Sequence, residues 1–188
     1  MTSSLSPRIK ELIAKARIVS FDGWQEQFGD AAIARFQTAD DDGVHLDDAT
    51  LESLPAGNVV QLLKEQARTI VDTARAQVLE QFPGITDPGG GLYPSVRADA
   101  CWRDFWHFLR CISYGIAAQR SDYTSTIGLS YLEQLYQELQ VPLDAMVYGL
   151  RSLQTASEQQ LSQSGLDETI APYFEHLIHA LNQFQPTD

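Results

Sequence analysis

Cysteine is scarce in this chain of 188 residues, which contains only Cys101 and Cys111. On one continuous helix, residues ten apart are separated by roughly 15 Å, whereas a disulfide needs Cα atoms within about 7 Å. We therefore expect the two thiols not to pair with each other. Two free thiols are typical of a reducing compartment.

Basic residues are also few: 13 lysines and arginines stand against 25 acidic residues, giving a formal net charge of −12. Such a charge repels phosphate backbones, so we expect no nucleic-acid binding. The sequence has no apolar run long enough to span a membrane, and its N-terminus lacks the apolar core of a signal peptide. We expect a cytoplasmic protein that does not insert into membranes.

Catalytic motifs are missing as well. The sequence contains no nucleophile elbow, phosphate loop, zinc-ligand spacing or catalytic triad, and the glycines at 89–91 do not follow a strand. His176 and His179 are three residues apart but have no third ligand nearby, so we expect no metal site there. The chain is predicted not to be an enzyme.

Helical periodicity is what the sequence does have, and no alternating strand pattern persists. The apolar spacing, with Asp167 as the cap of the last helix, predicts helices over about 7–20, 24–38, 47–54, 58–81, 95–118, 123–139, 143–162 and 167–182. These elements predict an all-α fold. Periodicity alone leaves a globin-like and a bundle-like arrangement open.

The helix expected over 95–118 carries an unusual set of chemical groups. Asp104 lies about one turn after Cys101 on the same face, and Phe105 and Phe108 lie beside them. A thiol can form a thioether, a carboxylate can accept ligand N–H bonds, and aromatic rings can cover a conjugated system. An open-chain tetrapyrrole would use all three. The alternative is that Cys101 is a small core residue and that Arg103 and Asp104 form surface ion pairs.

The residues around this helix resemble the phycobiliprotein family. The family's chromophore helix follows the pattern Cys-x-Arg-Asp-x-x-x-x-Leu-Arg-x-x-(Thr/Ser)-Tyr, which here is the stretch CWRDFWHFLRCISY. The preceding loop PGGGLYPSVRADAC resembles the family's Pro-Gly-Gly-Asn-x-Tyr loop, and segments before and after it also match. The resemblance extends from about Phe28 to the end of the chain.

The resemblance implies a globin-like phycobiliprotein fold with extra N-terminal helices. It divides one domain, 1–188, into an N-terminal extension (1–25), an N-terminal helical pair (28–55) and a globin core (56–188). The helical pair would join the chain to another copy or to a phycobiliprotein-like subunit. The protein would then be located in the cyanobacterial cytosol, associated with thylakoids through phycobilisomes.

The resemblance also implies a linear tetrapyrrole cofactor, phycocyanobilin or biliverdin, and assigns residues to it. Cys101 would attach the bilin and Asp104 would bridge its inner pyrrole nitrogens, while Arg103 and Arg97 would bind the propionates. Tyr136 would pack against the bilin. The remaining expected site residues are Phe108, Tyr93 of the loop, and His107.

Several positions depart from the family pattern. Gly91 stands where the family's loop has asparagine, and Val96 stands where many members have an arginine. Gln119-Arg120 replaces the Gly-Asp that usually follows the chromophore helix. These departures predict a divergent member. Two alternatives remain open: a haem-binding globin with His107 as the iron ligand, and a pigment-free assembly or regulatory protein.

Four further expectations concern burial. The acidic turn over 39–43 is expected to be solvated, and His45 within that region to be exposed. Trp102 and Trp106 are expected in the core, and Cys111 is expected to serve packing only.

Overall fold

The computed structural model describes residues 5–166 and 169–184. Over these residues the chain is all-helical, as predicted, with one isolated bridge between Val19 and Thr124 in place of any strand. The helices are α1 (Pro7–Lys15), the 3-10 turn η1 (Trp24–Glu26), α2 (Asp30–Asp41), α3 (Asp48–Glu52), α4 (Gly57–Glu65), α5 (Ala67–Gln81), α6 (Ser95–Ala118), α7 (Thr126–Leu139), α8 (Leu143–Gln163) and α9 (Ala171–Asn182).

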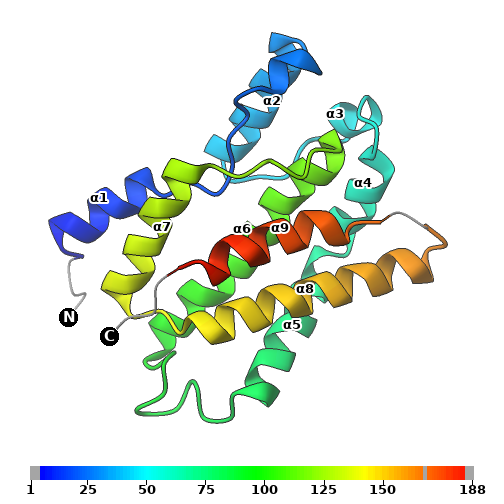
Figure 1. The fold of residues 1–188 in the computed structure, drawn as a ribbon. Coiled ribbons are helices and arrows are strands. Elements are labelled where there is room, and N and C mark those ends of the chain that lie inside the picture. Colours follow the sequence, from blue (N-terminus) through cyan, green and yellow to red (C-terminus); the bar gives the residue numbers. More distant parts are fainter. Residues whose placement is uncertain (1–4, 167–168, 185–188) are drawn as a thin grey trace.

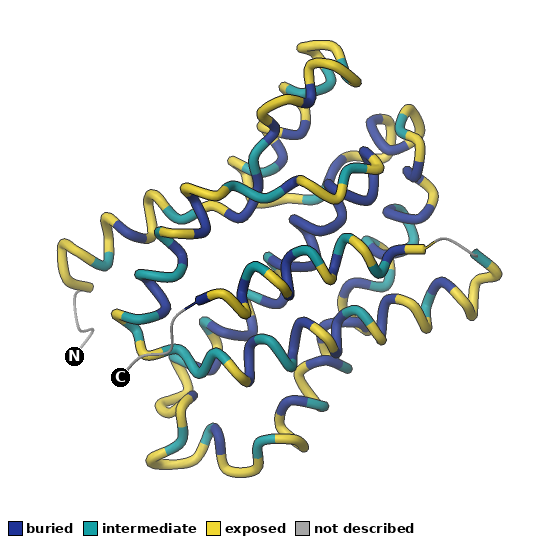
Figure 2. The backbone as a smooth tube through the Cα atoms, viewed as in Figure 1, coloured by how far each residue is buried: buried dark blue, intermediate teal, exposed yellow. Residues whose placement is uncertain are grey.

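α6 forms the centre of the molecule, and α4, α5, α8 and α9 pack against it (Figure 1). From Phe108 to Ala118 every residue of α6 is buried, as the dark blue tube in Figure 2 indicates. A helix that is buried on all sides must be covered by several neighbours. α8 comes so close that a Cβ on Gly149 would lie 2.1 Å from the ring of Phe105.

The N-terminal residues pack onto the same core. α1 lies against α7 and buries Leu12 completely. Trp24 is also fully buried, with its ring 5.0 Å from that of Phe36 on α2. By contrast, most of α2 stands away from the other helices in Figure 1. The division into extension, helical pair and globin core stays a prediction.

Helix boundaries follow local chemistry. Ser6, Asp47 and Ser125 accept hydrogen bonds from the first turns of α1, α3 and α7, as N-cap side chains do. α6 and α7 end where Gln119 and Gln140 adopt left-handed backbone conformations. The expected cap Asp167 lies outside the described residues, and α9 begins at Ala171.

Several local predictions were wrong. The helix expected over 24–38 is the short turn η1 followed by α2, because Gly29, the N-cap residue of α2, has an extended backbone that interrupts the helix. The helix expected over 58–81 is two helices that meet at Gln66.

Burial was also mispredicted at three places. The side chain of Asp40, within the turn expected to be solvated, is only 5% exposed because it packs beside buried Arg110. His45 is half-buried rather than exposed. Trp106 is 40% exposed, whereas Trp102 and Cys111 are buried as expected. In the described part of the chain, no helix is long and apolar enough to cross a membrane.

Candidate functional site

The thiol and carboxylate of the sequence motif lie on the first half of α6, and both are largely buried. Cys101 is 5% exposed, and burial together with the charge of Asp104 raises the pKa of its thiol to about 12. Burial likewise raises the pKa of Asp104 from its ordinary 3.8 to about 6. Both groups therefore bind protons more tightly than exposed groups of the same type would.

Tyr136 connects this helix to α7. Its hydroxyl donates a hydrogen bond of 2.8 Å to Oδ2 of Asp104, and the tyrosine itself is 5% exposed. This bond lowers the pKa of Asp104 and so opposes part of the effect of burial. A carboxylate has two oxygens and about four lone-pair positions, so Asp104 retains capacity for further donors.

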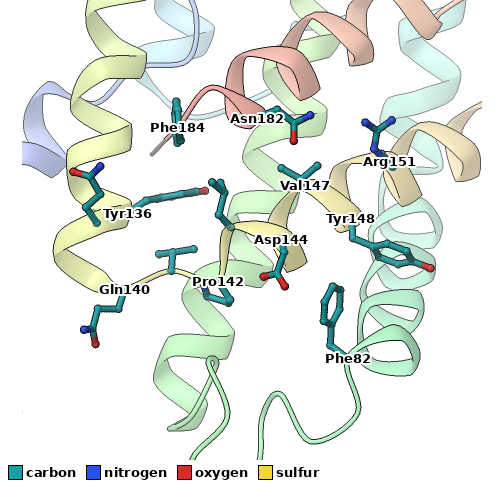
Figure 3. Close-up of a pocket in the computed structure, with 13 residues that line it drawn as sticks. Phe82, Tyr136, Gln140, Pro142, Asp144, Val147, Tyr148, Arg151, Asn182 and Phe184 are labelled. Carbon is teal, nitrogen blue, oxygen red and sulfur yellow. The ribbon is translucent and has the colours of Figure 1, made fainter. Parts of the chain in front are cut away.

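A cavity of about 850 Å³ opens beside Tyr136, within the range of small-molecule sites. Figure 3 shows Tyr136 reaching from α7 toward the first turns of α8, with Phe184 above it and Phe82 and Tyr148 further along. The cavity is lined by residues from the end of α5 and from α7, α8 and the end of the described chain: Phe82, Tyr136, Gln137, Gln140, Val141, Pro142, Leu143, Asp144, Val147, Tyr148, Arg151, Asn182 and Phe184.

Of the eight residues expected to bind a cofactor, Tyr136 alone lines this cavity. Cys101 and Phe108 are buried in the core, whereas Arg103 and Tyr93 are exposed. Tyr136 nevertheless joins the cavity to Asp104 through one hydrogen bond.

Arg97 already has partners. Its Nη2 donates to the carbonyl oxygens of Leu139 and Gln140 at 2.7 and 2.6 Å. It thereby caps the C-terminal end of α7, where carbonyl groups lack partners within the helix.

His107 lies away from the cavity lining, in a different group of residues. Its ring nitrogens, the thiol of Cys111 and the carboxylate of Asp40 offer ligand atoms within 4.8 Å of one another. Burial and the neighbouring Arg110 lower the pKa of His107 to about 4, so its ring is neutral at pH 7.

Sequence reasoning missed most of the cavity. Phe82, Arg151 and Phe184 line it from three separate parts of the chain. Pro142 and its neighbours lie in the downstream segment that carries part of the family resemblance, but nothing in their spacing indicated a cavity.

Comparison with known proteins gives the class of protein. A family profile described as "Phycobilisome protein" matches residues 35–181. The chain therefore belongs to the phycobilisome protein family, as the sequence motifs predicted.

Individual relatives are allophycocyanins. Allophycocyanin subunit alpha-B of Synechocystis sp. is 32% identical over 124 residues, which cover 66% of this chain and 76% of the relative. The alpha-B chain of Synechococcus sp. is 35% identical over 65% of this chain and 75% of its own. Allophycocyanin subunit beta-18 of Porphyra purpurea is 30% identical over 82% of this chain and 97% of its own.

A solved structure supports the fold. A far-red fluorescent biliprotein, derived from an allophycocyanin F subunit of Chroococcidiopsis thermalis, superposes with a TM-score of 0.63 at 22% identity, covering 73% of this chain and 99% of that chain. The predicted globin-like phycobiliprotein fold is confirmed.

The predicted function class, a bilin-binding protein of the phycobiliprotein type, is confirmed. The haem-binding and pigment-free alternatives are not favoured. Phycobiliproteins are generally pigment proteins without catalytic activity, and the absence of activity in this chain stays a prediction.

Proposed function

We propose that the chain holds one linear tetrapyrrole between α6 and the cavity beside Tyr136, attached through Cys101 and oriented by Asp104. One observation carries this proposal: the cavity of about 850 Å³ is bounded by a tyrosine whose hydroxyl bonds Asp104, a carboxylate buried on the motif helix. A bound bilin supplies absorption of visible light.

Asp104 would orient the cofactor by accepting hydrogen bonds from its pyrrole N–H groups. The hydrogen bond that Tyr136, a residue of the cavity lining, donates to Oδ2 supports this assignment. Charge-assisted bonds of this kind are about twice as strong as neutral ones. They would hold the carboxylate ionised, against the effect of burial on its pKa.

Cys101 would attach the cofactor by adding its sulfur to a vinyl-type carbon. The S–C bond forms, the thiol proton ends on the neighbouring carbon, and no oxidant is consumed. Because the thiolate is the reactive species and the pKa of Cys101 is about 12, attachment by the chain alone should be slow. We therefore expect a lyase to accelerate it.

Two cations are available for the acidic side chains of a bilin. Arg151 lines the cavity, and exposed Arg103 follows Cys101 by two residues. We assign the propionates to these two. Arg97 would contribute only if its bonds to the end of α7 were released.

Phycocyanobilin and biliverdin are both candidates for the cofactor. We further propose that α2, which stands away from the other helices, contributes to pairing with a second copy or another phycobiliprotein subunit. Such pairing would associate the chain with phycobilisomes at the thylakoid surface.

Co-expression with a source of either bilin tests the site. Absorption spectra and zinc-induced fluorescence on a denaturing gel should show a covalent pigment in the wild type and none in Cys101→Ser. Cys111→Ser, which changes the other buried thiol, is the matched control and should keep the pigment. A covalent pigment retained in Cys101→Ser would refute the attachment site.

The role of Asp104 needs a separate variant. Asp104→Asn should keep the attached pigment but weaken and blue-shift its red band, because a neutral amide holds the pyrrole N–H groups less firmly. Tyr136→Phe should change the band less, since it removes a donor to the carboxylate rather than the carboxylate. An unchanged spectrum in Asp104→Asn would contradict the assigned role.

A further inference from the structure

A second group of chemically reactive side chains lies apart from the cavity, where the C-terminal turn of α2 meets α6. It comprises Asp40, His107 and Cys111, whose carboxylate oxygen, ring nitrogen and sulfur lie within 4.8 Å of one another. His107 and Cys111 are four residues apart on α6 and so face the same direction. Asp40 comes from a segment about 70 residues earlier in the sequence.

The side chains of these three residues form no recorded hydrogen bonds with one another. Among the described residues, no hydrogen bond joins the His107 ring, the Cys111 thiol or the Asp40 carboxylate to any partner that the structure records. Asp40 has an ion pair with Arg110, at the long N–O distance of 3.6 Å, although its side chain is only 5% exposed. The three side chains can therefore turn toward a shared ion without breaking a recorded hydrogen bond of their own.

We propose that Asp40, His107 and Cys111 form a binding site for one divalent cation of the zinc type. Imidazole nitrogen, thiolate sulfur and carboxylate oxygen are the three ligand types that Zn²⁺ takes in proteins, and three protein ligands leave a fourth position for water. Mg²⁺ and Ca²⁺ prefer oxygen ligands, and they do not fit a site that offers sulfur and nitrogen.

The ligand atoms can reach a shared ion with small movements. Zinc binds nitrogen and oxygen at about 2.0–2.2 Å and sulfur at about 2.3 Å. In a tetrahedral site two such ligand atoms are roughly 3.5 Å apart, so atoms that now lie up to 4.8 Å apart would have to move together by about 1 Å. His107 is half-buried, which leaves a side from which an ion can enter.

Neighbouring positive charges should lower the affinity of this site for a cation. Arg110 lies beside Asp40, and the charge of Arg17 also reaches Asp40 and His107. Arg110 is held independently by the carbonyl oxygens of Ala39 and Asp40, each at 3.3 Å. It can therefore stay in place when the carboxylate turns to an ion. The ion would displace the thiol proton of Cys111, which leaves the site with a thiolate and a carboxylate to balance the metal.

The site would fasten α2 to α6. α2 packs mainly against η1 and through the ring of Phe36, and most of it stands clear of the other helices (Figure 1). A metal bond from Asp40 to α6 would hold its C-terminal end to the core.

Metal titration of the full-length chain tests this. After treatment with a chelator, calorimetry with Zn²⁺ should show one ion bound per chain, and Co²⁺ should produce a thiolate charge-transfer band in the near ultraviolet. The band should vanish in Cys111→Ser and persist in Cys101→Ser, the opposite of the pigment result. His107→Gln and Asp40→Asn should each weaken Zn²⁺ binding at least about tenfold.

Two further measurements leave the three proposed ligands unchanged, so they remain informative if a ligand variant does not fold. Zn²⁺ should slow amide hydrogen exchange in α2 of the wild type. Arg17→Gln, a change at an exposed residue, should tighten binding about two- to fivefold because it removes a nearby positive charge. No one-to-one binding by the wild type, a cobalt band that depends on Cys101, or unchanged affinity in both His107→Gln and Asp40→Asn would overturn the proposal.

Discussion

Asp104 is expected to destabilise the pigment-free protein at neutral pH, and Asp104→Asn is expected to stabilise it. The pKa of Asp104 is about 6 in the folded chain, against an ordinary value of 3.8. The folded state therefore holds this proton more tightly than the unfolded state does. The stability that the proton provides is complete below pH 3.8 and is lost as the pH rises through 6.

The two pKa values differ by about two pH units, and each pH unit is worth about 1.4 kcal/mol. Above pH 7 the ionised carboxylate should therefore cost about 3 kcal/mol of unfolding free energy. Asparagine has a similar shape and no charge, and its amide oxygen can still accept the bond from Tyr136. We expect the variant to be more stable than the wild type by about 3 kcal/mol at pH 7.5 and by roughly half of that at pH 5.

Urea unfolding of the pigment-free chain, followed by circular dichroism at several pH values, measures this difference. Asp99→Asn is the matched control, because Asp99 is exposed on the same helix. It should change the unfolding free energy by less than about 0.5 kcal/mol at each pH. A stability difference between wild type and Asp104→Asn that does not grow with pH would refute the reasoning, as would a less stable variant at pH 7.5.

Three further outcomes are expected. Leu12→Ala should cost about 2–5 kcal/mol in urea unfolding because Leu12 is fully buried between α1 and α7, whereas Ile13→Ala, at a residue that is 46% exposed, should cost far less. Gly149→Ala should cost about 1–3 kcal/mol through its clash with Phe105, and equal losses in Gly29→Ala, where a Cβ meets nothing within 4 Å, would contradict this. Burial, with help from Arg110 and Lys64, lowers the pKa of His45 to about 4, so the unfolding free energy should fall as the pH drops from 6.5 toward 4. His45→Gln should reduce that fall. A His45 ring that titrates near pH 6.5 by NMR would contradict this prediction.

The sequence predicted the central helix residue for residue, since α6 runs from Ser95 to Ala118 as expected. Its limits are set by local features: Pro94 before it and the left-handed Gln119 after it. The N-terminal region was predicted less well. There Gly29 divides an amphipathic pattern whose periodicity alone predicts one helix.

The site was predictable where its residues share one helix or, like Tyr136, where the family resemblance marks them. Cys101 and Asp104 follow from the motif, but the cavity is built from side chains of α5, α7, α8 and the end of the chain, which come together only through packing. The burial of Asp40 was unpredictable for the same reason, because it depends on a partner far away in the sequence. A run of acidic residues is usually solvated, and nothing in the sequence indicated that Arg110, 70 residues away, would hold one of them beside the core.

The cost of Asp104 to the pigment-free protein gives the proposed cofactor a source of affinity. A ligand whose N–H groups stabilise the ionised carboxylate would recover free energy that the chain alone loses at neutral pH. About 3 kcal/mol corresponds to roughly a hundredfold in affinity. Below pH 6 the carboxyl group is protonated in the free protein, and a bilin would have to displace that proton before it could bind. Reversible binding, measured in Cys101→Ser, should therefore weaken by up to about tenfold for each pH unit below 6. Affinity that stays constant from pH 7.5 to pH 5 would mean that the carboxylate does not receive the pigment's N–H groups.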